Sequence, residues 1–285
     1  MKPAAFAYLA PKTLADAVAM LAEVQDDGKV LAGGQSLVPA MNFRLARPGT
    51  LVDLNGVAEL AGVTGDSATG ISIGALTRHA TFHKPPFDGP LAELMAKVVR
   101  NIAHYPIRQR GTFGGSLSHA DPASEWCLVA ATLGATMHIA STAGTRTVPA
   151  AEFFQGTFTT ALGPNEILTR IELPPLPAGW RSGFYEFSRR KGDFALAMAL
   201  AALRMDGGTI REARLGVGGV ADRAHKLSAV EAFLTGKPAS EATFAEAAEM
   251  ARGLVKVTSD IHASEAFRSD LLGTVVRRAL AEAAS

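Results

Sequence analysis

The sequence predicts an α+β protein whose two parts differ in architecture. Over the first 173 residues, short apolar runs typical of strands alternate with segments of helical spacing. Beyond residue 179, strand-like runs come first and helical segments follow. Between these parts, residues 174–179 contain three prolines and one glycine, which indicates a linker. We therefore expect the main domain boundary at this linker.

The N-terminal elements carry local signals. Thr13 followed by Asp16 is a variant of the capping box and predicts a helix that starts directly after the threonine. Residues 29–32 predict a short buried strand that ends at a glycine pair. Ser36 is the expected N-cap of a helix over residues 37–45, which follows that pair.

The remaining elements follow from apolar periodicity and from the glycines and prolines that bound each segment. Strands are expected over 51–54, 70–76, 135–140 and 166–173, and helices over 90–100 and 122–133. A hairpin or three-stranded sheet is expected from 183 to about 220, followed by three helical stretches, the last at 269–284. We expect a first domain of residues 1–175, with subdomains of about 1–55 and 56–175, and a second domain of residues 180–285.

Composition excludes several classes of protein. Hydrophobic residues make up 48% and charged residues 19%, which rules out wholesale disorder. The formal net charge of +1 argues against nucleic acid and anionic membranes as partners. The single cysteine, Cys127, excludes a disulfide scaffold and a cysteine-rich metal cluster within this chain. Its apolar neighbours predict a buried, unreactive thiol.

The sequence predicts a cytoplasmic protein. No signal-peptide pattern is visible, because prolines and charged residues interrupt the apolar residues near the N-terminus. The longest uninterrupted apolar run, residues 194–203, is about half the length that a membrane span requires.

Two glycine pairs are the strongest candidates for a ligand site. Residues 32–36 contain the first pair, between a predicted strand and a predicted helix, and residues 111–116 contain the second, with a helix shortly after. Paired glycines let a ligand approach the backbone closely, and their N–H groups can converge on an anion. One such pair alone is adequately explained as a tight turn. Two pairs with polar neighbours favour a nucleotide whose diphosphate they clamp.

A third glycine segment is a decoy. Residues 216–221 fit the dinucleotide spacing G-x-G-x-x-A, and Glu241 lies about 20 residues further on. However, the preceding strand carries Arg211, Glu212 and Arg214, which do not suit the buried first strand of a parallel sheet. The repeated βαβ units of a Rossmann fold are also missing, so we reject that fold.

Hydrolytic and metal motifs are absent, since the chain has neither H-E-x-x-H nor G-x-S-x-G. His79 and His83 are four residues apart, and we interpret them as a surface pair. His119, Asp121 and Glu125 form a polar cluster behind the second glycine pair. Because a proline follows Asp121, that aspartate is also the expected N-cap of the helix over 122–133. Both roles can hold at once.

These residues resemble the FAD-binding medium subunits of molybdenum hydroxylases, the group of xanthine dehydrogenase and carbon monoxide dehydrogenase. The resemblance rests on residues 32–37, 112–123 and 189–195, in the order and approximate spacing of the family, and spans essentially the whole chain. The basic triplet 189–191, considered alone, predicts a solvated turn or a contact with a partner subunit or a phosphate. The resemblance implies a two-subdomain, PCMH-type FAD-binding domain and a smaller α+β C-terminal domain with an antiparallel sheet and a helix bundle.

The resemblance also implies a set of cofactor-binding residues, with no catalytic acid or base and no metal ligand. The glycine loops would wrap the diphosphate of FAD, Ile102 would lie near the adenine, and Leu168 near the flavin or adenine. Asp121 and Glu125 would accept hydrogen bonds from ribose or ribityl hydroxyls. The complete set is Ala32, Gly33, Gly34, Gln35, Ser36, Ile102, Gly111, Thr112, Phe113, Gly114, Gly115, Asp121, Glu125 and Leu168.

Four positions depart from the family pattern. Glu125 replaces the usual aspartate, Ser116 a common asparagine, and Phe113 a smaller aliphatic residue. Phe194 stands where some members carry a tyrosine near the flavin ring, so any effect of that hydroxyl is lost. The first loop has no histidine or cysteine suited to a covalent flavin link, and we expect FAD to be dissociable.

The resemblance implies an oxidoreductase subunit that works in a heterotrimer, with a dimer of heterotrimers as the expected assembly. One cysteine cannot hold a [2Fe–2S] cluster, and the chain lacks the length for a molybdopterin domain. Both would belong to partners, a small and a large subunit, and electrons would leave through FAD to NAD, a quinone or oxygen. Two alternatives stay open: a stand-alone FAD-dependent oxidase or reductase, and a non-catalytic nucleotide-binding assembly protein.

Overall fold

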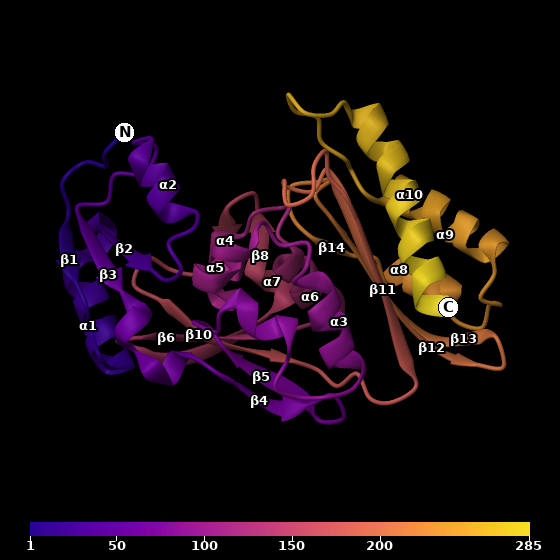
Figure 1. Cartoon of the computed structure of the whole chain (residues 1–285), viewed down its shortest axis with the longest axis horizontal. Helices are drawn as coiled ribbons and strands as arrows, with labels where there is room; N and C mark the ends of the chain where they lie inside the picture. Colours follow the sequence, from indigo (N-terminus) through magenta and orange to yellow (C-terminus); the bar gives the residue numbers. More distant parts are fainter.

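A three-stranded parallel sheet forms the N-terminal end of the computed structural model, which describes residues 1–285 (Figure 1). Its strands, in spatial order, are β1 (Ala7–Leu9), β3 (Thr50–Asp53) and β2 (Gly28–Leu31), connected through α1 (Leu14–Val24) and α2 (Leu37–Asn42). The Thr13 hydroxyl accepts the N–H of Asp16 over 3.1 Å, so the capping-box prediction is confirmed. The helix over 37–45 ends earlier than predicted, and Ser36 makes no side-chain cap bond to it.

The middle of the molecule contains a five-stranded antiparallel sheet in the order β4-β5-β10-β6-β7. These strands are β4 (Val63–Asp66), β5 (Gly70–Gly74), β10 (Ile167–Leu173), β6 (Thr136–Ser141) and β7 (Gly144–Pro149). The helices of this part are η4 (His79–His83), α3 (Pro90–Val98), α4 (Tyr105–Arg110), α5 (Phe113–His119), α6 (Glu125–Leu133) and α7 (Ala150–Phe153). A short hairpin of β8 (Phe154–Gly156) and β9 (Thr159–Thr160) completes it. The central strand, β10, is the last strand before residues 174–179, so this sheet is complete only when the chain reaches the linker.

The C-terminal part is a four-stranded antiparallel sheet with three helices on its outer face (Figure 1). The strands are β11 (Trp180–Phe187), β12 (Ala197–Asp206), β13 (Thr209–Gly218) and β14 (His225–Lys226), and the helices are α8 (Ser228–Leu234), α9 (Glu241–Leu254) and α10 (Glu265–Ala284). The predicted order of strands followed by three helices is confirmed. Even α10, with 20 residues the longest helix, is not apolar enough to cross a membrane, and no other helix is.

Strand β12 explains the longest apolar run of the sequence. Side chains alternate between the two faces of a strand, and here both faces are buried. Met198 and Leu200 point into the central core, which they share with α3, α5 and α6, whereas Ala199 and Leu203 point into the core beneath α9 and α10. An uninterrupted apolar run therefore marks a strand that joins two cores.

The structure corrects one sequence interpretation, the cap at Asp121, and supports another, the rejection of a Rossmann fold. Asp121 is not the N-cap of a helix from residue 122, because α6 begins at Glu125 and the hydroxyl of Ser124 accepts the N–H of Cys127. Asp121 instead accepts the N–H of Ala123 over 2.9 Å and shapes the turn before the helix. The decoy at residues 216–221 begins in β13 of an antiparallel sheet, which agrees with the rejection of a Rossmann fold.

Candidate functional site

The first glycine loop presents free backbone donors. Residues 32–36 leave the carboxyl end of the parallel strand β2, the end at which ligands bind in parallel sheets. The N–H groups of Gly33, Gly34, Gln35 and Ser36 donate no hydrogen bond within the protein. Gly34 has φ +71°, a left-handed conformation that favours glycine, and the Gln35 amide donates to the Gly33 carbonyl over 3.0 Å. Consecutive free donors on such a turn can surround an anion.

The second glycine loop lies directly against the first. A Cβ on Gly33 would lie 2.5 Å from the carbonyl oxygen of Arg110 and 2.7 Å from Cα of Gly111. A Cβ on Gly115 would lie 3.6 Å from Cβ of Ala32. Two loops separated by almost eighty residues in the sequence therefore meet, and at Gly33 there is room only for glycine.

The second loop does not offer the free donors that the sequence suggested. Helix α5 begins inside it, because the Thr112 hydroxyl accepts the N–H of Gly115 over 3.1 Å. The N–H of Phe113 donates to the Thr77 carbonyl and that of Gly114 to the Ala75 carbonyl, both over 2.9 Å. This loop therefore acts as a close wall, and the first loop supplies the amide donors.

Two residues that the sequence analysis missed brace the loops. The Asn55 amide donates to the carbonyl of Ala32 over 2.8 Å, and Arg78 donates to the carbonyl of Arg110. Arg78 also donates to the Asn55 amide oxygen over 2.5 Å. Arg78 thus connects the first loop, through Asn55, with Arg110 at the start of the second loop. No local motif marks Arg78, since its role depends on contacts far along the chain.

His79 lies beneath the second loop, so its interpretation as half of a surface pair is wrong. It is 5% exposed, and a Cβ on Gly111 would lie 2.5 Å from its Nε2. Burial, with the nearby Arg108 and Arg78 guanidinium groups, lowers the pKa of His79 to about 3. His83 accepts a hydrogen bond from Nε of Arg108. Neither histidine belongs to a group of side chains able to hold a metal ion.

Three carboxyl groups lie near the start of α6. Asp121 and Glu125 come from the turn and the first helical residue, and Glu186 comes from β11. Burial raises the pKa of Glu186, and the Glu125 charge raises it further. Burial also raises the pKa of Glu125. Oε2 of Glu186 is buried without a hydrogen-bond partner, which leaves it available to a ligand hydroxyl.

The remaining candidate residues are buried in the central core. Ile102 is 7% and Leu168 is 4% exposed, and the Phe113 ring packs 5.0 Å from that of Trp126. The contribution of Phe113 to a ligand is therefore limited to its backbone, and the ligand contacts of Ile102 and Leu168 stay predictions. Phe194, by contrast, is 76% exposed.

Cys127 is buried, as predicted. Burial raises the pKa of its thiol to about 12, so the thiolate does not form near neutral pH.

The free amides, the close wall and the orphaned carboxyl oxygen together fit a nucleotide that carries a diphosphate and sugar hydroxyls.

Family models match almost the entire chain. Residues 4–176 match the FAD binding domain in molybdopterin dehydrogenase, and residues 182–283 match the CO dehydrogenase flavoprotein C-terminal domain. The nicotine 6-hydroxylase medium subunit of Paenarthrobacter nicotinovorans is 36% identical over 285 residues, with 99% of each chain covered.

Solved structures agree with this match. Quinoline 2-oxidoreductase from Pseudomonas putida 86 superimposes with a TM-score of 0.93 at 43% identity, covering 100% of this chain and 98% of that one. Carbon monoxide dehydrogenase from Hydrogenophaga pseudoflava gives a TM-score of 0.93 at 33% identity, covering 99% of this chain and 98% of that one.

Proposed function

This chain belongs to the family of FAD-binding medium subunits of molybdenum hydroxylases, and we propose that it conducts electrons from an iron–sulfur partner subunit to an external acceptor. It is thus a subunit of an oxidoreductase. Bound FAD supplies the redox chemistry, and the chain orients it and sets its electrostatic surroundings.

The observation that carries this proposal is the free row of amides at Gly33, Gly34, Gln35 and Ser36 beside Gly111. Amide donors on a glycine turn stabilise the negative charge of a diphosphate, and the absence of side chains at the contact lets it approach. Helix α2 has only six residues, so we assign this role to the amides of the turn and not to a helix dipole.

The carboxyl groups support the sugar end of the same ligand. We assign Asp121 and Glu125 as acceptors for ribose or ribityl hydroxyls, as the resemblance implies, and add Glu186 because its orphaned oxygen needs a donor. Glutamate at position 125 is one methylene longer than aspartate, and its charge acts on Glu186 of β11.

The other redox centres of this family lie on partner subunits. One buried cysteine cannot ligate a [2Fe–2S] cluster, and no group of side chains can hold a metal ion. We propose a large molybdopterin subunit and a small [2Fe–2S] subunit, assembled as a dimer of heterotrimers. NAD, a quinone or oxygen is the proposed class of terminal acceptor.

The diphosphate assignment is tested by ligand series on the purified chain. Titration with FAD, FMN and riboflavin is followed by the change in flavin fluorescence. We expect one FAD per chain and affinity at least about 100-fold weaker for riboflavin, because it lacks the phosphates that the amides bind. Equal affinities for FAD and riboflavin would contradict the assignment, and no uptake of FAD would favour a non-flavin role for the fold.

The electron route is tested in the assembled complex. Flavin reduction, followed by absorbance, should require the small subunit when the substrate of the large subunit is the reductant. Reduction and turnover by the isolated chain with its own organic substrate would instead identify a stand-alone oxidase or reductase.

A further inference from the structure

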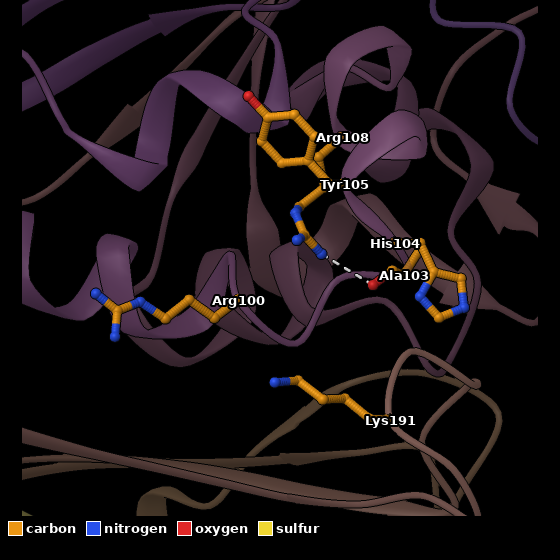
Figure 2. Close-up of a pocket in the computed structure, with 6 residues that line it drawn as sticks. All are labelled: Arg100, Ala103, His104, Tyr105, Arg108 and Lys191. Carbon is orange, nitrogen blue, oxygen red and sulfur yellow. Dashed lines mark hydrogen bonds between the residues drawn. The ribbon is translucent and has the colours of Figure 1, made fainter.

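A basic cavity of about 330 Å³ lies between the end of α3 and the loop that precedes β12 (Figure 2). Its lining consists of Arg100, Ala103, His104, Tyr105, Arg108 and Lys191. Figure 2 shows Lys191 and Arg108 on opposing segments with their charged ends directed toward the space between them, while the Arg100 side chain extends to one side. The cavity is within the size range of small-molecule sites.

The cations of this basic cavity have no ion-pair partner. Arg100, Arg108 and Lys191 form no ion pair, and no carboxylate lines the cavity. The neighbouring Arg190 differs, because it pairs with Asp193 over 3.2 Å within the same turn. Three cations that line one cavity, with no carboxylate in its lining, favour an anionic ligand.

The Arg108 side chain is held in place before any ligand arrives. Its Nη1 donates to the carbonyls of Ile102 and Ala103 over 2.6 and 2.9 Å, and its Nε donates to His83 over 2.9 Å. Nη2 has no partner. Such a guanidinium loses little conformational freedom when it binds an oxyanion, because its orientation is already fixed.

Lys191 reaches the cavity because its loop is anchored beside it. Gly192 has φ +87°, and a Cβ there would lie 2.6 Å from Cε1 of His104 and 3.1 Å from the carbonyl of Ala103. Only glycine allows this approach. The cavity is therefore built from two parts of the chain about ninety residues apart.

The basic cavity is near the glycine loops and distinct from them. Helix α4, six residues or about 9 Å long, begins at Tyr105 beside the cavity and ends at Arg110, directly before the second loop. Arg110 and the loops do not line the cavity. An anion held here would be a neighbour of a ligand held by the loops.

We propose that the basic cavity is a second phosphate site, which binds the phosphate group of a nucleotide other than the FAD held by the glycine loops. Arginine recognises phosphate through paired N–H donors, and lysine adds a point charge. On the basis of the proposed function, that nucleotide is the electron acceptor of the complex. The diphosphate of FAD itself carries the same phosphate groups and is the competing ligand for this cavity.

The proposal is tested on the full chain saturated with FAD. Inorganic pyrophosphate and ADP-ribose are titrated calorimetrically into the wild type, Arg100→Ala and Lys191→Ala. We expect each variant to weaken both probes about tenfold, because one charge-assisted contact is lost. Arg189→Ala is the matched control, since Arg189 belongs to the same turn and does not line the cavity. It should bind both probes like the wild type.

FAD affinity is measured on the same variants. Unchanged FAD affinity with weakened probe binding supports a separate site. Weakened FAD affinity in Arg100→Ala and Lys191→Ala would overturn the proposal and assign the cations to FAD itself, and unchanged probe binding would overturn it equally. In the chain without FAD the same variants still report on the cavity, so a failure of FAD binding is distinguishable from a failure of the second site.

Discussion

The indole N–H of Trp126 donates to Nδ1 of His79 over 3.0 Å, and this buried hydrogen bond ties α6 to η4 below the second glycine loop. The backbone N–H of His79 also donates to the carbonyl of Gly111 over 3.0 Å. The position of the loop therefore depends on a histidine that must remain neutral to accept the hydrogen bond from the indole N–H.

Acid should destabilise the protein through His79. Its folded-state pKa, about 3, is below its usual value of 6.5, so between these pH values the unfolded chain binds a proton that the folded chain does not. Stability should then fall as the pH drops through this range, by at most about 1.4 kcal/mol per pH unit from this residue. Urea unfolding at pH 4.5 and 7.5 measures the difference.

The variant His79→Asn isolates this effect, because an asparagine oxygen can accept the indole proton and does not titrate. We expect a smaller loss of stability in acid than in the wild type. His262→Asn, at an exposed histidine, should leave the wild-type difference unchanged. An equal acid loss in wild type and His79→Asn would contradict the role of His79.

Gly33→Ala should separate the glycine loops. The added methyl group would collide with backbone atoms of Arg110 and Gly111, which cannot move aside as a flexible side chain can. We expect a lower melting temperature and loss of most FAD binding. Gly253→Ala is the control, because that helical glycine has open space around it and should gain up to about 1 kcal/mol. Thermal melts measure the stability of both variants, and FAD titration measures their binding stoichiometry. If Gly33→Ala bound FAD like the wild type, the close contact between the two loops would be refuted.

Arg78→Lys should weaken FAD binding while the chain stays folded. One ammonium group cannot reproduce the forked contacts to Asn55 and to the Arg110 carbonyl, so the loops lose their brace. We expect the dissociation constant for FAD to rise about tenfold, as for one lost charge-assisted bond. Arg211→Lys, on an exposed ion pair of β13, should bind FAD like the wild type. Fluorescence titration decides the comparison.

Glu186→Gln should stabilise the chain without FAD at alkaline pH. The folded-state pKa of Glu186 is raised, so the folded chain holds a proton that the unfolded chain has released. Wild-type stability should therefore fall as the pH rises from the ordinary glutamate value of 4.5 through the raised one. Glu186→Gln removes this pH dependence of stability. Glu246→Gln, at an exposed residue of α9, should retain it. Denaturant unfolding from pH 5 to 8 gives the slopes, which should differ between the two variants.

Local patterns in the sequence were sufficient for most elements. The hydroxyl of Thr13 caps α1 as its spacing predicts, and the apolar runs at β5, β10 and β12 are strands. The glycines of the first loop also predicted a turn between a strand and a helix, and such a turn lies between β2 and α2. Where a competing local cap was available, prediction failed: Ser124, rather than Asp121, caps α6.

Neighbouring residues were enough to predict the α+β order of elements, the linker at residues 174–179 and the glycine turn at residues 32–36. Three other facts needed the folded chain: the N–H groups of Phe113 and Gly114 are already hydrogen-bonded, Glu186 lies near Glu125, and Lys191 lines the same cavity as Arg100. These facts depend on contacts between segments about forty to ninety residues apart. No local spacing encodes such contacts, because packing of the three layers brings the segments together.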